Sequence, residues 1–344
     1  MKKSNDLKTI NNNRTKIMGF AALWIFIFHS WITINNNTNS ISSIYEFIIR
    51  IGFCGVDIFM LLSGFGLVNS IKKGTKTFYY NRIKRISFTY VLASILAIFI
   101  YKWTLLEFIQ NISFYTYFTK PIYSHLWFIP TILIFYLLFP IYYKLFEKAK
   151  NKNIFIILTI IIWFIISFLL KGYIKEEIYG ITNRIPIFIT GIWMGWFITE
   201  KSFKFPKGFL LINIIILIIG FQLCYLTSFK GLTILLPVSN SLVNYFVALP
   251  ITILLAKLFD ICSIKYVNNF FEFYGTISLQ LYCFQEILLK YLYAAGVYIQ
   301  FKPILVIVLK IVFFIFVTII AKSALSLEKI FWNKIEHKKI EHAK

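Results

Sequence analysis

The chain has 344 residues, of which 59% are hydrophobic, and its mean hydropathy is +0.74. Soluble domains are about 45–50% apolar, so this composition excludes an ordinary soluble protein and indicates a polytopic membrane protein. The formal net charge of +22 does not indicate nucleic-acid binding, because the lysines and arginines lie between apolar segments. The four cysteines show no paired spacing, so we predict neither a disulfide nor a metal site.

The predicted elements are long apolar runs, each of which crosses the bilayer as one helix if it reaches about 20 residues. We expect about ten such spans in an all-α, polytopic helical fold. They lie near 17–34, 45–70, 86–103, 126–146, 153–171, 184–199, 208–227, 242–259, 271–291 and 303–325. No linker or internal repeat stands out, so we predict a single transmembrane domain over 1–344.

The basic residues predict the orientation of these spans. Lys and Arg concentrate in the N-terminal segment, after every second predicted span, and in the C-terminal segment. Cytoplasmic loops of membrane proteins carry this excess of positive charge. We therefore place both termini in the cytoplasm, as basic tails of about 1–16 and 327–344.

A few polar side chains fall inside the predicted spans. His29 follows a run of aliphatic and aromatic residues, and Asp57 lies near the middle of the second span. Ionisable groups at such depth are costly and indicate a functional site. His125 and Arg184 begin their spans, and Glu286 lies in the outer third of the ninth. We expect one polar cluster that opens toward the outer half of the bilayer, with Asp57 at its floor.

Two arginines precede the third span, on the predicted cytoplasmic side. Arg82 and Arg85 are three residues apart and share one face of a helix. Two guanidinium groups on one face bind phosphate well, because each donates two parallel hydrogen bonds. The alternative is that they only set the topology and contact anionic lipid headgroups.

Several segments together resemble the acyltransferase-3 family of integral membrane acyltransferases. The second-span segment is the most specific and resembles the family pattern Gly-Val-Asp-x-Phe-Phe-x-x-Ser-Gly-Phe. The segments that carry the resemblance are 19–29 (GFAALWIFIFH), 55–65 (GVDIFMLLSGF), 78–85 (FYYNRIKR) and 125–128 (HLWF), with weaker echoes at 184–191 (RIPIFITG) and 278–282 (SLQLY). They follow the family order over nearly the whole chain.

Two positions depart from the family pattern. The family has an arginine eleven positions before the histidine of the first span, and that position is Met18 here. Arg14 falls within about 60° of the His29 face of a helix, so we expect it to substitute for the missing cation. The second departure is Gln285, where the family often has a histidine; Glu286 beside it retains an acidic group.

The resemblance implies transfer of an acyl group, often acetyl, from acyl-CoA to a hydroxyl of a surface carbohydrate or its lipid-linked precursor. His29 is then the general base, or accepts the acyl group itself for relay, and Asp57 orients the imidazole. Imidazole suits this chemistry because it changes charge near neutral pH.

The remaining residues of the implied site bind the two substrates. Arg82, Arg85 and Arg14 bind the donor, and the acceptor or the oxyanion contacts His125, Trp127, Arg184 and Glu286. We expect acyl-CoA as co-substrate, with no bound cofactor and no metal. The Asn-, Ile- and Lys-rich composition indicates an AT-rich bacterial genome, hence the cytoplasmic membrane of a bacterium.

Two other functions are compatible with the sequence. Buried His, Asp and Glu also form proton relays in transporters, although no pair of broken helices repeats in two halves of this chain. Alternatively, Met18 and Gln285 mark a family member that binds its partner without catalysis.

Overall fold

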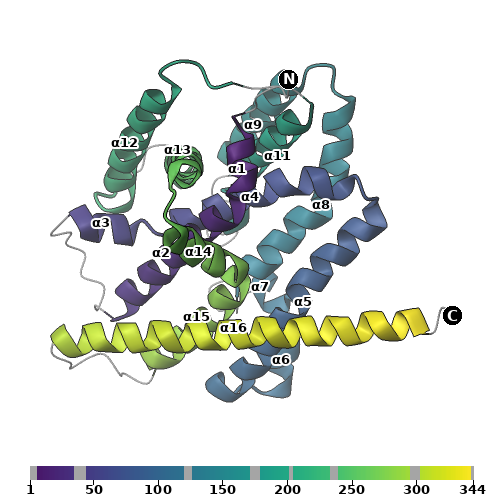
Figure 1. The fold of residues 1–344 in the computed structure, drawn as a ribbon, viewed down its shortest axis with the longest axis vertical. Helices are drawn as coiled ribbons and strands as arrows, with labels where there is room; N and C mark the ends of the chain where they lie inside the picture. Colours follow the sequence, from purple (N-terminus) through teal and green to yellow (C-terminus); the bar gives the residue numbers. More distant parts are fainter. Residues whose placement is uncertain are drawn as a thin grey trace. The chain divides into compact units, whose positions relative to one another are not determined.

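The computed structural model describes residues 6–34, 44–119, 126–170, 179–200, 204–232, 239–294 and 303–341, and these residues form helices and connecting turns (Figure 1). The helices are α1 (Lys8–Asn12), α2 (Arg14–Ile34), α3 (Ile44–Arg50), α4 (Cys54–Ile71), α5 (Thr75–Tyr101), α6 (Leu105–Ile112), α7 (Tyr115–Thr119), α8 (Phe128–Lys148), α9 (Lys152–Leu169), α10 (Tyr179–Thr182), α11 (Ile185–Glu200), α12 (Phe209–Ser228), α13 (Ser239–Ile261), α14 (Lys265–Thr276), α15 (Ser278–Ala294) and α16 (Pro303–Glu341).

Seven of the described helices are long and apolar enough to cross a membrane: Cys54–Ile71, Thr75–Tyr101, Phe128–Lys148, Lys152–Leu169, Phe209–Ser228, Val243–Ile261 and Ile307–His337. The protein is therefore a polytopic helical membrane protein, as predicted. The expected number of about ten single spans is not confirmed, because α11 has 16 residues and α15 has 17.

Two predicted spans are interrupted in the structure. The expected span 45–70 is divided into α3 and α4 by a turn at 51–53, where the Gly52 N–H donates to the Ile49 carbonyl, three residues back, at 3.0 Å. Such tighter bonds end the regular α-helical ladder. The expected span 271–291 is likewise divided at Ile277 into α14 and α15.

Two helices continue well beyond their apolar runs. α5 begins at Thr75 rather than near 86, and α16 continues to Glu341 rather than ending near 325. The added segments are rich in Lys, Arg and Glu, which are good helix formers outside a membrane. The predicted C-terminal tail of 327–344 is thus helical up to Glu341.

The described chain forms two compact units. The first comprises 1–25, 39–80 and 131–275, and the second comprises 26–38, 81–130 and 276–344. Four helices, α2, α5, α8 and α14, contribute residues to both units.

In the first unit, α4 packs closely against α11. A Cβ atom added to Gly64 would collide with the Phe188 carbonyl oxygen, and one added to Gly191 would collide with the Leu61 carbonyl oxygen. Small residues let membrane helices approach this closely.

The N-terminal segment of the first unit is packed rather than a solvated tail. The Asn13 side-chain amide donates to the Ala256 carbonyl of α13 at 3.2 Å, and the Phe205 N–H donates to the Asp6 carboxylate at 2.7 Å. Ile10 and Ile17 are buried between these contacts. From residue 6 onward, the segment expected as a basic tail is therefore part of the helical core.

In the second unit, α16 packs beside α15 and is joined to α5 by side-chain contacts (Figure 1). The Thr89 hydroxyl of α5 and the Gln280 amide of α15 both donate to the Glu328 carboxylate of α16, each at 2.8 Å. The Tyr90 hydroxyl donates to the Asn111 carbonyl at 2.8 Å and so fixes α6 to α5. These polar contacts tie the helices of the second unit together.

Candidate functional site

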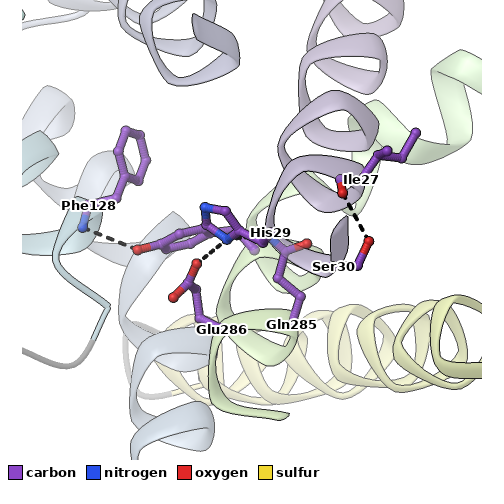
Figure 2. Close-up of polar contacts among 7 residues, drawn as sticks. Ile27, His29, Ser30, Phe128, Gln285 and Glu286 are labelled. Carbon is purple, nitrogen blue, oxygen red and sulfur yellow. Dashed lines mark hydrogen bonds and ion pairs between the residues drawn. The ribbon is translucent and has the colours of Figure 1, made fainter. Parts of the chain in front are cut away.

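In the second unit, the ring atom Nδ1 of His29 on α2 contacts the carboxylate atom Oε1 of Glu286 on α15, and this contact is an ion pair when the ring is protonated. Figure 2 shows the imidazole directed toward the carboxylate, with the Gln285 amide alongside. The two side chains are 24% and 15% exposed, so the pair is largely screened from water yet still reachable. The structure thus brings two residues of the predicted polar cluster into contact.

The Glu286 carboxylate determines which imidazole nitrogen is available for chemistry. A carboxylate only accepts hydrogen bonds, so Nδ1 carries the proton that points toward it. In the neutral ring this leaves the lone pair on Nε2. No hydrogen-bond partner of Nε2 is found among the described residues, so this nitrogen is available to take up a proton.

Gln285 flanks the same ring edge. Its Nε2 atom lies 3.5 Å from His29 Nδ1, and the side chain is 1% exposed. Since the protonated Nδ1 is a donor, an amide N–H beside it makes a packing contact rather than a hydrogen bond. The residue expected to depart from the family pattern therefore lies against the ring.

The 125–128 segment enters the second unit through an unusual backbone conformation. Leu126 has φ of 52°, a left-handed conformation that bulky residues adopt rarely and at an energetic cost. Its side chain is buried. α8 then begins at Phe128, whose N–H donates to the Tyr282 hydroxyl at 3.2 Å. Sequence reasoning missed this role of Tyr282, because only the turn geometry reveals it.

The other predicted residues of this segment are only partly described. His125 lies outside the described residues. Trp127 is half-buried, and its ring meets the Phe128 ring edge-on at a centroid distance of 6.2 Å. Their contact with an acceptor stays a prediction.

Asp57 is part of a separate polar cluster in the first unit. Its carboxylate is 2% exposed and accepts a hydrogen bond from the Asn244 side chain of α13 at 3.1 Å. The positive charge of Arg184 acts on it favourably, while Arg184 itself donates from Nη1 to the Gly180 carbonyl at 2.7 Å. The observed contacts join Asp57 to Asn244 and His29 to Glu286, so orientation of His29 by Asp57 stays a prediction.

The predicted donor-binding arginines lie on two helices. Arg14 begins α2, and its guanidinium lies against Gly66 of α4 in the first unit. Arg82 and Arg85 lie on α5 in the second unit, where Arg82 is half-buried and Arg85 is exposed. Arg85 is close enough to act electrostatically on the Glu328 carboxylate.

The described residues contain no group of three or more His, Cys, Asp or Glu side chains placed to hold a metal ion. A half-buried imidazole, paired through one nitrogen with a carboxylate and open at the other, is suited to moving a proton.

Fold and site together define a multi-pass helical membrane protein with a histidine–glutamate pair in its second unit. The model of the acyltransferase domain of the acyltransferase-3 family matches residues 19–322, which is most of the chain. The protein belongs to this family and is a membrane acyltransferase, so the resemblance found in the sequence is confirmed. Membership implies an acyl donor and an acyl acceptor. No curated protein and no solved structure matches the chain.

Proposed function

We propose that the protein moves an acyl group, acetyl in the first instance, from cytoplasmic acyl-CoA to a hydroxyl of a cell-surface or lipid-linked carbohydrate. The observation that carries this proposal is the ion pair between His29 Nδ1 and Glu286. The pairing holds the ring in the tautomer whose Nε2 atom accepts the hydroxyl proton.

In the proposed reaction, Nε2 of His29 takes the proton as the acceptor oxygen attacks the thioester carbonyl. The tetrahedral intermediate collapses, the C–S bond breaks, and the CoA thiolate leaves and recovers the proton from the imidazolium. Glu286 stabilises the positive ring that forms in between, as the acid does in other histidine–carboxylate pairs. This gives Glu286 a role on the base rather than on the acceptor or oxyanion.

A relay through the ring is the alternative route within the same function. Here Nε2 attacks the thioester, CoA leaves, and the acceptor hydroxyl then takes the acyl group from the acyl-imidazole. Both routes need the same free nitrogen. Rapid quenching with labelled acetyl-CoA, followed by mass spectrometry of the peptide that contains His29, separates them.

The donor and acceptor sides follow from charge. CoA carries several phosphates, and the guanidinium groups of Arg14, Arg82 and Arg85 lie on helix ends rich in basic residues. On the acceptor side we propose His125, Trp127 and Arg184. This assignment places both termini in the cytoplasm and the protein in the cytoplasmic membrane of a bacterial cell, where it modifies the cell envelope.

The deciding experiment compares the surface glycans of a deletion strain with those of its parent by mass spectrometry. We expect an acyl mass increment in the parent that is missing in the deletion strain, and its mass identifies the acyl group.

His29→Ala supplies the inactive variant for complementation, and His337→Ala, exposed on α16, is the matched control. We expect His337→Ala to restore the increment. His29→Ala should lower turnover by at least about 100-fold, the usual contribution of a general base. Full acyl content with His29→Ala, at equal protein level in the membrane, would rule out the proposal.

A further inference from the structure

Gly66 of α4 lies directly beneath the guanidinium group of Arg14 in the first unit. A Cβ atom built on Gly66 would lie 2.6 Å from Cζ, from Nη1 and from Nη2 of Arg14. Equal distances to three atoms of one planar group mean that the guanidinium lies flat over this position. No side chain fits there without displacing it.

Gly64, on the same helix, behaves differently. A Cβ on Gly64 would meet the backbone of Phe188, which has no room to move, whereas the atoms above Gly66 are the far end of a flexible side chain. A methyl group at Gly66 is therefore expected to move the Arg14 guanidinium and to leave the α2 and α4 backbones in place. A substitution at Gly66 is therefore expected to act through the Arg14 guanidinium group.

The flat contact also directs the hydrogen-bond donors of Arg14. The N–H groups of a guanidinium lie in its plane, and the face of this plane, rather than its edge, meets α4 at Gly66. Such an in-plane edge is the geometry that binds a phosphate through two parallel hydrogen bonds. The side chain of Met18, one turn further along α2, is buried and uncharged, so of these two positions Arg14 is the one that carries a positive charge.

We infer that Gly66 is a positioning residue for the acyl donor: it seats Arg14 so that the guanidinium binds a phosphate of CoA. This inference rests on the proposed function. It predicts that Gly66→Ala weakens donor binding through Arg14, and that it does so only for donors that carry phosphate.

The test measures His29-dependent acyl transfer by purified full-length protein, with membranes of the deletion strain as acceptor. Gly66→Ala should raise KM for acetyl-CoA roughly tenfold, the value of one charge-assisted hydrogen bond, and change kcat less than about twofold. With S-acetyl-pantetheine, which has no phosphate, the variant should match the unmodified protein. Asn69→Ala, exposed one turn further along α4, is the control and should change neither constant.

A double-mutant cycle shows whether Gly66 acts through Arg14. Arg14→Ala should raise KM for acetyl-CoA by a similar factor, and Arg14→Ala combined with Gly66→Ala should be no worse than Arg14→Ala. Additive effects, an unchanged KM in Gly66→Ala, or equal losses with S-acetyl-pantetheine would each overturn the inference. The proposed function fails separately, if His29→Ala retains transfer.

Discussion

The second unit buries two glutamates on neighbouring helices, and their partners differ. Glu328 of α16 is 8% exposed and accepts hydrogen bonds from the Thr89 hydroxyl and the Gln280 amide, both neutral groups. Glu286 of α15 is somewhat more exposed and pairs with Nδ1 of the His29 ring.

Under the proposed function, this difference separates a structural carboxylate, Glu328, from one that acts in the reaction, Glu286. Fixed neutral donors satisfy Glu328 in one arrangement and hold α5, α15 and α16 together. The partner of Glu286 is an imidazole, which in the proposed reaction gains and loses a proton, and a carboxylate beside it stabilises the charged form. The two residues therefore differ in the chemistry of their partners.

The largest expected effect comes from removing the charge of Glu286. Glu286→Gln keeps the size of the side chain and removes its charge. The protonated ring then loses its counter-charge, and the amide can turn either its oxygen or its NH2 group toward Nδ1, so the tautomer is no longer fixed. We expect kcat to fall about 100-fold, within the range that general-base catalysis contributes. The measurement is acyl transfer from acetyl-CoA under saturating donor.

Glu336→Gln is the matched control, because Glu336 is exposed and pairs with Lys84 on the surface. Unchanged kcat in Glu286→Gln, with transfer still dependent on His29, would show that the ion pair has no part in the reaction.

The next effect concerns stability at Glu328. Glu328→Gln removes a charged acceptor of two buried hydrogen bonds, so we expect the free energy of unfolding to drop by about 1–3 kcal/mol. Turnover at a temperature where the variant is folded should stay within about twofold of the unmodified protein. Thermal unfolding in detergent and the transfer assay measure the two quantities. A loss of turnover as large as in Glu286→Gln would contradict the structural role that we assign to Glu328.

The smallest effect comes from a third glutamate of this unit, Glu107 at the exposed end of α6. Its carboxylate accepts hydrogen bonds from the Thr104 N–H and hydroxyl, each at 2.8 Å, and these bonds hold the pKa of Glu107 below its usual range. The Thr104 hydroxyl in turn accepts from the Glu107 N–H at 3.3 Å, which completes a capping box.

Because the pKa of Glu107 is lowered in the folded state, the capping box stabilises the folded state at pH values above the usual pKa range of a glutamate. This stabilisation is lost as the pH falls through the lowered pKa. Thr104→Ala should raise amide exchange in 105–112 roughly fivefold at neutral pH, as expected for an N-cap worth about 1 kcal/mol. The difference between the two proteins should shrink on acidification, and a difference independent of pH would contradict this account.

Much of the helical framework could be predicted from the sequence. The ends of α8, α9, α12 and α13 lie within a few residues of the predicted spans, because apolar runs bounded by polar residues define them. The interruptions at 51–53 and at Ile277 fall inside apolar sequence, where hydropathy carries no signal. The start of α5 and the end of α16 were missed because charged residues continue both helices outside the apolar runs.

The functional site could likewise be predicted only in part from the sequence. A histidine and an acid deep in apolar segments indicated a polar cluster, and the family resemblance indicated the residues to examine. The acid that contacts His29 depends on the packing of α2 against α15, which are separated by some 250 residues of sequence. The left-handed backbone conformation at Leu126 could not be predicted from the sequence either, because leucine rarely adopts it.

The length of α16 has a practical consequence. At 1.5 Å per residue its 39 residues extend about 58 Å, whereas a bilayer core is about 30 Å thick. A good part of this helix therefore projects beyond the lipid as a stiff rod whose base is bonded to α5 and α15. A rigid fiducial domain fused in helical register near Glu341 would be held rigidly relative to the second unit. Such a domain would help to align particle images of this small membrane protein in electron cryomicroscopy.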